Sequence, residues 1–411
     1  MPNKKRILYA ETNYDDEEIN SVIDVLQNQP HSLVGGKYTK EFEKNISKLF
    51  GKKYGILVNS GSSANLLALT SLNLEEGSEI ITPCLTFSTT VSPIIQLGLI
   101  PNFVDIELRT LNIDANKIEE AINENTSAIM IPNLMGNLPD WLKIKKIAQK
   151  HSLPIIEDSA DTLGYKINDK TTGEISDLVT TSFYASHIIT CAGIGGMVCT
   201  DDFDLYKNIT VMRGWGRSSE LFNPDAKLLS KKEITNRFEI KVDQISYDRK
   251  FLFDQPGYNF FAPEICAAFG NTQLQKFDAL SSSRSSNFQY LKDWIEKELS
   301  DFIITPLQKE NVDTIWLAYP VILKNLNTKK TRNKLQIFLE ENNVQTRPIF
   351  SGNITKQPMM EGRKFKTNDN GYENSDFIMK KYADTFNNPY QKFLKSKPSE
   401  LFTLHPMLIT K

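Results

Sequence analysis

The 411-residue chain lacks a long apolar segment. No run of about 18 apolar residues occurs, which is the length that a membrane span needs. The first basic residues are not followed by the apolar stretch of about seven or more residues that defines a secretory signal. We therefore expect neither a membrane span nor a secretory signal.

Cysteine is scarce, and no charge of one sign dominates. The four cysteines, Cys84, Cys191, Cys199 and Cys266, are scattered and form no CxxC pair. Isolated thiols fit a reduced cytoplasmic protein better than a disulfide framework or a zinc site. The 48 basic and 50 acidic residues give a net charge of −2. We expect no metal site, and this charge balance predicts no nucleic-acid partner.

The N-terminal third contains two helical patterns. Residues 15–27 form the first, with apolar side chains at helical spacing that we expect to face the core: Ile19, Val22, Ile23 and Leu26. Residues 38–50 form the second, with Phe42, Ile46 and Leu49 on its inner face. Both patterns predict amphipathic helices.

Short apolar runs then alternate with helical stretches. Strands are expected at residues 54–58, 79–82, 102–105, 128–132, 153–156, 180–184 and 196–200. Helices are expected between several of them, at 63–72, 89–97 and 140–150. This order predicts an α/β fold in which a mainly parallel sheet is sandwiched by helices.

The pattern changes twice in the second half. Residues 217–254 are polar with weak periodicity, and such a long excursion is more often functional than accidental. After a helix at 264–280, the chain predicts a helix at 287–299, a strand at 315–323, a helix at 329–342 and a strand at 344–348. We therefore expect a large domain, 1–280, and a smaller α+β domain, 281–411.

Four polar clusters fall where ligands bind parallel sheets, at the carboxyl ends of strands. Asn59–Asn65 joins a strand to a helix, where glycine, hydroxyls and free N–H groups could hold a phosphate, although the segment could also be a plain N-cap turn. Glu157–Asp161 follows a strand, so a carboxylate there could pair with a protonated ring nitrogen or could cap a helix.

The other two clusters are less specific on their own. Ser182–His187 ends in a histidine beside a strand, which is usually a hydrogen-bonded structural residue. Gly257-Tyr258-Asn259 could be a simple β-turn. The turn Gly193–Gly196 does not match GxGxxG, and no Walker pattern occurs, so nucleotide-binding folds are disfavoured.

Together the clusters resemble the DegT/DnrJ/EryC1/StrS sugar aminotransferase family of fold-type I pyridoxal phosphate enzymes. The resemblance rests on NSGSSANLLAL, TPCLTFSTTVSPIIQLG, IIEDSADTLG, SFYASH, GGMVCTDD and GYN, in that order. It implies an aminotransferase-like fold, in which Gly61, Ser62 and Ser63 hold the cofactor phosphate with help from Ser182.

The resemblance also implies roles for four further residues and for a second copy of the chain. Phe87 would stack on the pyridine ring, Asp158 would pair with the ring nitrogen, and Asp161 would lie near the ring hydroxyl. Asn259 would reach the phosphate of the partner subunit's cofactor, so the protein would be a homodimer with shared active sites.

Family aminotransferases carry a lysine five residues after the serine of SFY, and here that position is His187. This exchange resembles the 3-dehydratase branch, which acts on nucleotide-linked 4-keto-6-deoxyhexoses. One group of that branch holds an iron–sulfur cluster on cysteines, but the matching positions here are Ala160, Ser218 and Ser219. The chain is therefore more similar to the cluster-free group, which acts on GDP-4-keto-6-deoxymannose and uses glutamate as amino donor.

Histidine cannot bond covalently to the cofactor as lysine does, which suits a freely held pyridoxamine phosphate. An imidazole with an ordinary pKa of about 6.5 can act as the base that begins loss of the sugar's C3 hydroxyl. Two alternatives stay open: an ordinary nucleotide-sugar aminotransferase, and a cofactor- or sugar-binding pseudoenzyme that regulates without catalysis.

Overall fold

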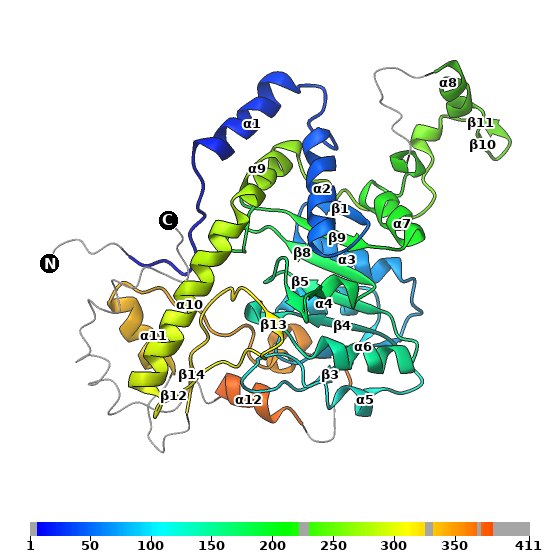
Figure 1. Cartoon of the computed structure of the whole chain (residues 1–411). Helices are drawn as coiled ribbons and strands as arrows, with labels where there is room; N and C mark the ends of the chain where they lie inside the picture. The colour runs from blue at the N-terminus through cyan, green and yellow to red at the C-terminus, as the bar shows by residue number, and fades with distance from the viewer. Residues whose placement is uncertain (1–5, 222–229, 325–331, 368–370, 381–411) are drawn as a thin grey trace.

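The computed structural model describes residues 6–221, 230–324, 332–367 and 371–380. A seven-stranded sheet lies at the centre, in the order β1-β9-β8-β5-β4-β2-β3 (Figure 1). Its strands are β1 Tyr54–Val58, β2 Glu79–Pro83, β3 Ile100–Val104, β4 Thr126–Pro132, β5 Ile155–Ser159, β8 Leu178–Ser182 and β9 Gly196–Thr200. All are parallel except β9, which runs antiparallel to both β1 and β8.

Helices cover both faces of this sheet. Leu57 belongs to one apolar core, whereas its neighbours Ile56 and Val58 belong to another, because successive side chains of a strand point to opposite faces. The covering helices are α2 Lys37–Leu49, α3 Gly61–Ser71, α4 Ser88–Gln96, α6 Trp141–Lys150 and α7 Phe203–Arg213, with a single turn at α5 Ile118–Ala121. The expected sandwich of helices around a mainly parallel sheet is confirmed.

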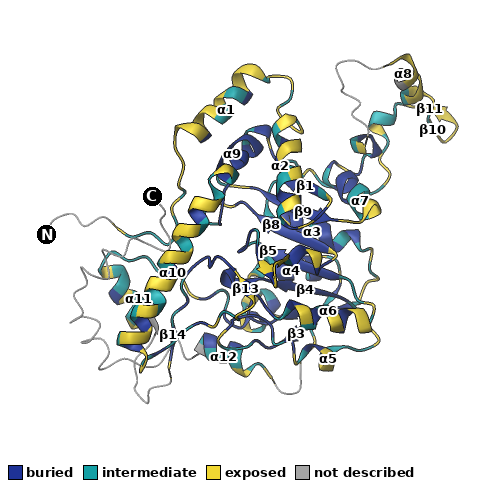
Figure 2. Cartoon of the chain, viewed as in Figure 1, coloured by how far each residue is buried: buried dark blue, intermediate teal, exposed yellow. Residues whose placement is uncertain are grey.

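Helix α1 (Asp16–Asn28) departs from the expectation for its inner face. Ile19, Ile23 and Leu26 are 43%, 40% and 58% exposed, and the residues that it buries are Glu18 and Val25 (Figure 2). Glu18 is buried because Gln273 and Lys276 donate hydrogen bonds to its carboxylate. The prediction that this face of α1 is buried is therefore wrong for the single chain, in which the apolar row is exposed to solvent.

The polar excursion 217–254 forms an arm that projects beyond α7 (Figure 1). Its described part contains α8 Lys231–Phe238 and the strands β10 Lys241–Val242 and β11 Ile245–Ser246. Large apolar side chains along the arm are exposed: Ile234, Phe238, Val242, Ile245, Tyr247, Phe251 and Phe253. The arm therefore carries apolar surface that the chain itself leaves uncovered.

The C-terminal part is less regular than the sequence predicts. Its helices and paired strands are α9 Glu264–Gln275, α10 Phe277–Leu299, β12 Ile303–Ile304, β14 Ile322–Leu323, α11 Arg332–Glu341 and α12 Glu373–Lys380. A separate small sheet is formed by β13 Val312–Asp313, which pairs with β6 Lys166–Ile167, and by β7 Lys170–Thr171, which pairs with β6 on its other side. The predicted strands at 315–323 and 344–348 are wrong. Only Ile322–Leu323 pairs in the first, and Val344 makes an isolated bridge to Ile7 in the second.

The first of these segments is irregular because it lies on the large sheet's loops. The Leu317 amide donates to the Met135 carbonyl, and Trp316 stacks on Phe288 of α10. The expected domain boundary at residue 280 falls inside α10, so the division into two domains remains a prediction. Residues 381–411 of the expected second domain lie outside the described residues.

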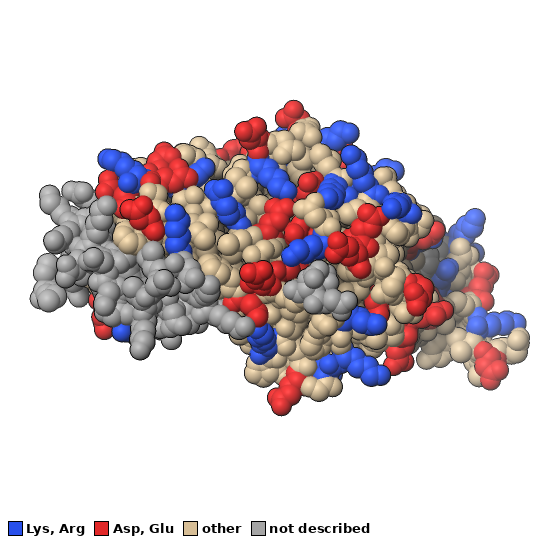
Figure 3. All heavy atoms as spheres, turned by 90° about the horizontal axis from the view of Figure 1, so that it is seen from below, with Lys and Arg blue, Asp and Glu red and all other residues tan. Residues whose placement is uncertain are grey.

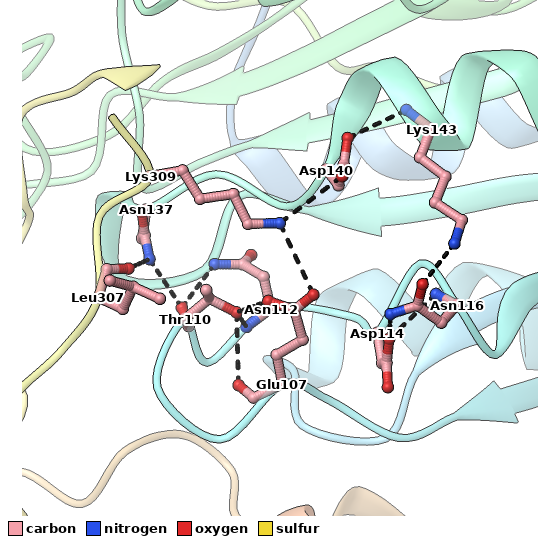
Figure 4. A network of polar contacts seen from close by, with 10 residues as sticks. All are labelled: Glu107, Thr110, Asn112, Asp114, Asn116, Asn137, Asp140, Lys143, Leu307 and Lys309. Carbon is pink, nitrogen blue, oxygen red and sulfur yellow. Dashed lines mark hydrogen bonds and ion pairs between the residues drawn. The ribbon is translucent and has the colours of Figure 1, made fainter. Parts of the chain in front are cut away.

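A polar network joins the loop after β3 to the segment that precedes β13 (Figure 4). The Asn137 amide donates to the carbonyls of Thr110 and Leu307 at 2.9 and 3.0 Å. Lys309 Nζ lies 3.6 Å from Glu107 and 3.8 Å from Asp140. These contacts fix the C-terminal segment against the sheet's loops, close to Met135.

The described helices include none with the length and apolar composition of a membrane span. On the face shown in Figure 3, basic and acidic side chains of the described residues are interspersed. No cluster of basic side chains stands out among the described residues on this face.

Candidate active site

The first cluster of polar residues forms the start of α3. Ser60 is the N-cap, and its hydroxyl accepts a hydrogen bond from the Ser63 amide at 3.1 Å. The Ser63 hydroxyl donates to the Asn59 side chain at 2.7 Å. Gly61 and Ser62 occupy the first two helical positions, where amides have no partner within the helix, so this turn offers N–H groups to an anion.

Gly61 is required here because β8 passes very close to it. A Cβ atom at position 61 would lie 2.7 Å from the Ser182 Cβ atom and 3.1 Å from its hydroxyl. Ser182 is the last residue of β8 and is buried. The two predicted phosphate ligands from distant segments, Gly61 and Ser182, are therefore direct neighbours.

Asp158 is held by donors from two helices. The side-chain amide of Asn65 in α3 and the hydroxyl of Thr90 in α4 each donate to its Oδ2 atom at 2.8 Å. The backbone amide of Ala160 donates to Oδ1 at 3.2 Å. Burial raises the pKa of this carboxyl above its usual range, and the three hydrogen bonds oppose that shift. A cation brought to Asp158 would be favoured in this desolvated position.

Asp161 is three residues further along the chain and is also buried. Its Oδ2 atom accepts a hydrogen bond from the Met135 amide at 2.9 Å. Burial raises its pKa to about 7, the Met135 hydrogen bond opposes that shift, and the nearby negative charge of Asp158 adds to it. Asn112 holds the backbone next to Met135 in place, because its side-chain oxygen accepts a hydrogen bond from the Leu134 amide at 3.0 Å.

His187 lies in the loop between β8 and β9. The loop is folded back on itself, because the Ala185 amide donates to the Gly193 carbonyl and the His187 amide to the Tyr184 carbonyl. The imidazole Nδ1 atom is buried and has no partner among the residues that the structure describes. Burial lowers the pKa of His187 to about 4, the nearby Ser182 backbone opposes the shift without forming a hydrogen bond to Nδ1, and the charge of Arg284 adds to it.

Phe87 and Asn259 expose their side chains. Phe87 precedes α4 and is 51% exposed, with its ring edge against Phe350 at 5.7 Å between centroids. Asn259 is exposed and pairs through its backbone with Gly214. Its neighbour Phe260 accepts a hydrogen bond from the Asn59 backbone amide at 2.9 Å, so Asn259 lies beside the turn that begins α3 in its own chain.

These contacts bring the four clusters of the sequence together. Asn65 joins the first to Asp158, Gly61 meets Ser182 and therefore the third, and Asn59 bonds to the segment of Asn259. Two residues of the site were not predicted. Thr90 occurs within a stretch of hydroxyl residues that gave no spacing signal, and Arg284 comes from a helix about a hundred residues beyond His187.

The residues present suit pyridoxal phosphate. The start of α3 offers amides and hydroxyls for a phosphate, and the close approach of Gly61 to Ser182 excludes any side chain there. Asp158 is a buried carboxylate that suits a protonated pyridine nitrogen, and the unpartnered Nδ1 of His187 fits a group that acts on a bound molecule. Within the described residues, no group of three or more His, Cys, Asp or Glu side chains could hold a metal ion.

The fold and the site together define a pyridoxal phosphate enzyme of the aminotransferase-like class. Residues 12–384 match the model of the DegT/DnrJ/EryC1/StrS aminotransferase family, and the chain belongs to this family. Members of the family depend on pyridoxal phosphate, and so does this chain.

The particular relatives include dehydratases. The chain is 36% identical to the lipopolysaccharide biosynthesis protein RfbH of Salmonella typhimurium, over 81% of this chain and 77% of the relative. It is 32% identical to the GDP-4-keto-6-deoxy-D-mannose 3-dehydratase of Escherichia coli O55:H7, over 90% and 92%. A structure of GDP-4-keto-6-deoxymannose-3-dehydratase with a trapped PLP-glutamate geminal diamine superposes with a TM-score of 0.80 at 27% identity, covering 98% of this chain and all of the other.

Proposed function

We propose that this protein is a 3-dehydratase that removes the C3 hydroxyl of a nucleotide-linked 4-keto-6-deoxyhexose. His187 carries the proposal, because it stands at the position of the family's lysine. The nearest upstream lysines, Lys166 and Lys170, are exposed on β6 and β7. The relatives that are named as 3-dehydratases support this reading, and they favour GDP-4-keto-6-deoxymannose as the sugar.

The chain's own residues then have distinct tasks. Bound pyridoxamine phosphate supplies the amine that condenses with the C4 ketone and the conjugated ring that accepts electrons. Its phosphate is held by Gly61, Ser62, Ser63 and Ser182. The Phe87 side chain stacks on the ring. Asp158 keeps the pyridine nitrogen protonated, while Asp161 lies near the ring hydroxyl.

His187 moves the proton at the cofactor's C4′ carbon. Its low pKa leaves the imidazole neutral at pH 7, so a lone pair is available to accept a proton. The C3 hydroxyl then departs, and the product hydrolyses to a 4-keto-3-deoxy sugar and ammonia. L-Glutamate restores the amine form, in agreement with the glutamate adduct of the solved relative.

A homodimer is part of the proposal. The open apolar row of α1 and the exposed apolar side chains of the arm are surfaces that a second copy would cover. Asn259 would serve the partner subunit's cofactor, as in the resemblance to the family. We place the reaction in the cytoplasm, in deoxysugar synthesis for lipopolysaccharide O-antigen.

Product analysis tests the proposal directly. Protein loaded with pyridoxamine phosphate is mixed with GDP-4-keto-6-deoxymannose and glutamate, and the sugar is examined by mass spectrometry while ammonia is assayed. A dehydratase gives a sugar that lacks the C3 oxygen, together with ammonia. An aminotransferase, which the family description favours as the second candidate, gives a 4-amino sugar that keeps its C3 hydroxyl, and a pseudoenzyme gives neither product.

A further inference from the structure

A pocket beside His187 contains a half-buried cation, Arg284. It is lined by the N-terminal segment Ala10–Asn13, by the loop 185–190 that carries His187, and by Gln273, Leu280 and Arg284. Arg284 extends from α10, and its Nη1 atom donates to the Leu317 carbonyl at 3.2 Å. The pocket therefore combines the proposed base with a guanidinium from a different part of the chain.

The charge of Arg284 is not neutralised by the residues that the structure describes. No carboxylate of the described ranges forms an ion pair with it, and its Nε atom is buried without a partner. The unpartnered Nδ1 of His187 lines the same pocket. A cation that is partly withdrawn from water is stabilised when an anion accompanies it, so the pocket is suited to an anionic group that accepts hydrogen bonds from both side chains.

We infer that Arg284 binds a carboxylate of the amino donor in this pocket. The inference rests on the proposed function, which requires an α-amino dicarboxylic acid to react at the cofactor atom that His187 serves. After the donor's nitrogen has joined that atom, its α-carboxylate is only two bonds from the nitrogen. A cation beside His187 is therefore where that carboxylate would lie, and guanidinium is well shaped to bind it.

A carboxylate in the pocket also has a consequence for His187. If it accepts a hydrogen bond from Nδ1–H, the imidazole proton is fixed on Nδ1, and Nε2 keeps the lone pair that accepts a proton. Glu11 faces the same pocket but is exposed, so solvent screens its repulsion. Arg284 is thus a binding residue for the donor that also sets the tautomer of the base.

Calorimetry with glutarate tests the inference, because this dicarboxylate has no amine and cannot react with the cofactor. Arg284→Gln in the cofactor-loaded protein should weaken glutarate binding about 10- to 100-fold, as expected for loss of hydrogen bonds to a charged group. Arg109→Gln is the matched control, because Arg109 likewise donates to one carbonyl, that of Thr305, but is exposed. Unchanged glutarate affinity in folded Arg284→Gln would overturn the inference.

A second variant does not depend on the folding of Arg284→Gln. Glu11→Gln removes an exposed negative charge, and it should tighten glutarate binding up to about five-fold at low salt. Weaker binding would place the anion elsewhere and overturn the inference.

Two half-reactions distinguish this inference from the proposed function. Arg284→Gln should slow the change in cofactor absorbance on addition of glutamate, yet leave the single turnover of keto sugar by the amine form within about three-fold, since only the donor's carboxylate is lost. Equal losses in both half-reactions would indicate a merely structural role and overturn it. A wild-type protein that binds glutarate through Arg284 but aminates the sugar would end the dehydratase proposal alone.

Discussion

At the scale of single residues, the proposed function makes the side chain at position 187 the difference between dehydration and amino transfer. A lysine at position 187 would bond to the cofactor, whereas an imidazole can only exchange protons with it. The structure adds that this imidazole is desolvated and close to a cation, so its neutral form prevails near pH 7. The neutral imidazole has a lone pair free to accept a proton at that pH, while the same surroundings lower its affinity for the proton.

His187→Asn should therefore lower turnover about 100- to 10,000-fold, the usual contribution of a general base, while cofactor and sugar still bind. The measurement is exchange of the C4′ hydrogen of pyridoxamine phosphate with solvent deuterium in the presence of the keto sugar. His187→Lys serves as a comparison, because it should restore a covalent link and shift the visible absorbance. Exchange in His187→Asn at the wild-type rate would show that another group is the base.

The low pKa of His187 also predicts how stability depends on pH. In the unfolded chain the imidazole has a pKa of about 6.5, whereas in the folded chain its pKa is about 4. Between these two pH values the unfolded state binds one more proton than the folded state at this side chain. The stability that neutral His187 contributes is full above pH 6.5 and is lost as pH falls from 6.5 to 4. Urea unfolding of cofactor-free wild type should show this loss, and His187→Asn should show less of it. Parallel pH curves for the two proteins would contradict the prediction.

At the scale of elements, the site depends on how closely α3 approaches β8. Gly61→Ala would push a methyl group against Ser182, so the start of α3 should move away from the end of β8. Cofactor affinity should fall by about ten-fold or more, because the proposed phosphate ligands come from both elements. Fluorescence titration of the cofactor-free protein measures it.

Gly77→Ala is the control for this change. Gly77 has a φ of +85° with open space around it, so alanine there costs backbone strain but touches nothing near the site. It should lower thermal stability slightly and leave cofactor affinity as it is. Equal affinities in Gly61→Ala and wild type would show that the phosphate is held elsewhere.

The large sheet could be predicted from the sequence because its strands are short apolar runs that stay buried on both faces. Strands β1 and β9 begin and end where the pattern predicts. The same reasoning failed for residues 315–323, which are apolar because they pack on Phe288 and the Met135 loop, not because they pair in a sheet. It also failed for α1, where apolar spacing predicts a buried face. The spacing cannot show whether that face is covered by the same chain or by a second one.

The candidate site was predictable where its residues lie at the carboxyl end of a strand, as Asp158 and Ser182 do, or shortly after one, as His187 does. The resemblance to the family supplied the roles, since the residue pattern alone left each cluster with a structural alternative. Thr90 and Arg284 were not predictable, because each reaches the site from a helix that is remote in sequence and has no distinctive spacing. Only folding brings Arg284 of α10 to the loop of His187.

At the scale of the whole molecule, the question is whether one chain completes the site. The apolar row of α1 and the arm both leave the chain open to a second copy. Asn259 lies beside the chain's own Asn59, and its side chain is exposed. A dimer in which Asn259 crosses to the partner's cofactor would explain why this asparagine is exposed.

Mixed dimers of Asn259→Ala and His187→Asn chains test this arrangement. If Asn259 acts across the interface, one site of each mixed dimer carries both changes and the other carries none, so about half of wild-type activity per dimer should return. If Asn259 acts within its own chain, every site carries one change, and activity stays at the level of the separate variants. The chains are given different affinity tags, mixed dimers are purified through both tags, and turnover of the keto sugar is measured. Dimers of each single variant are the controls, because neither should recover activity when mixed with itself.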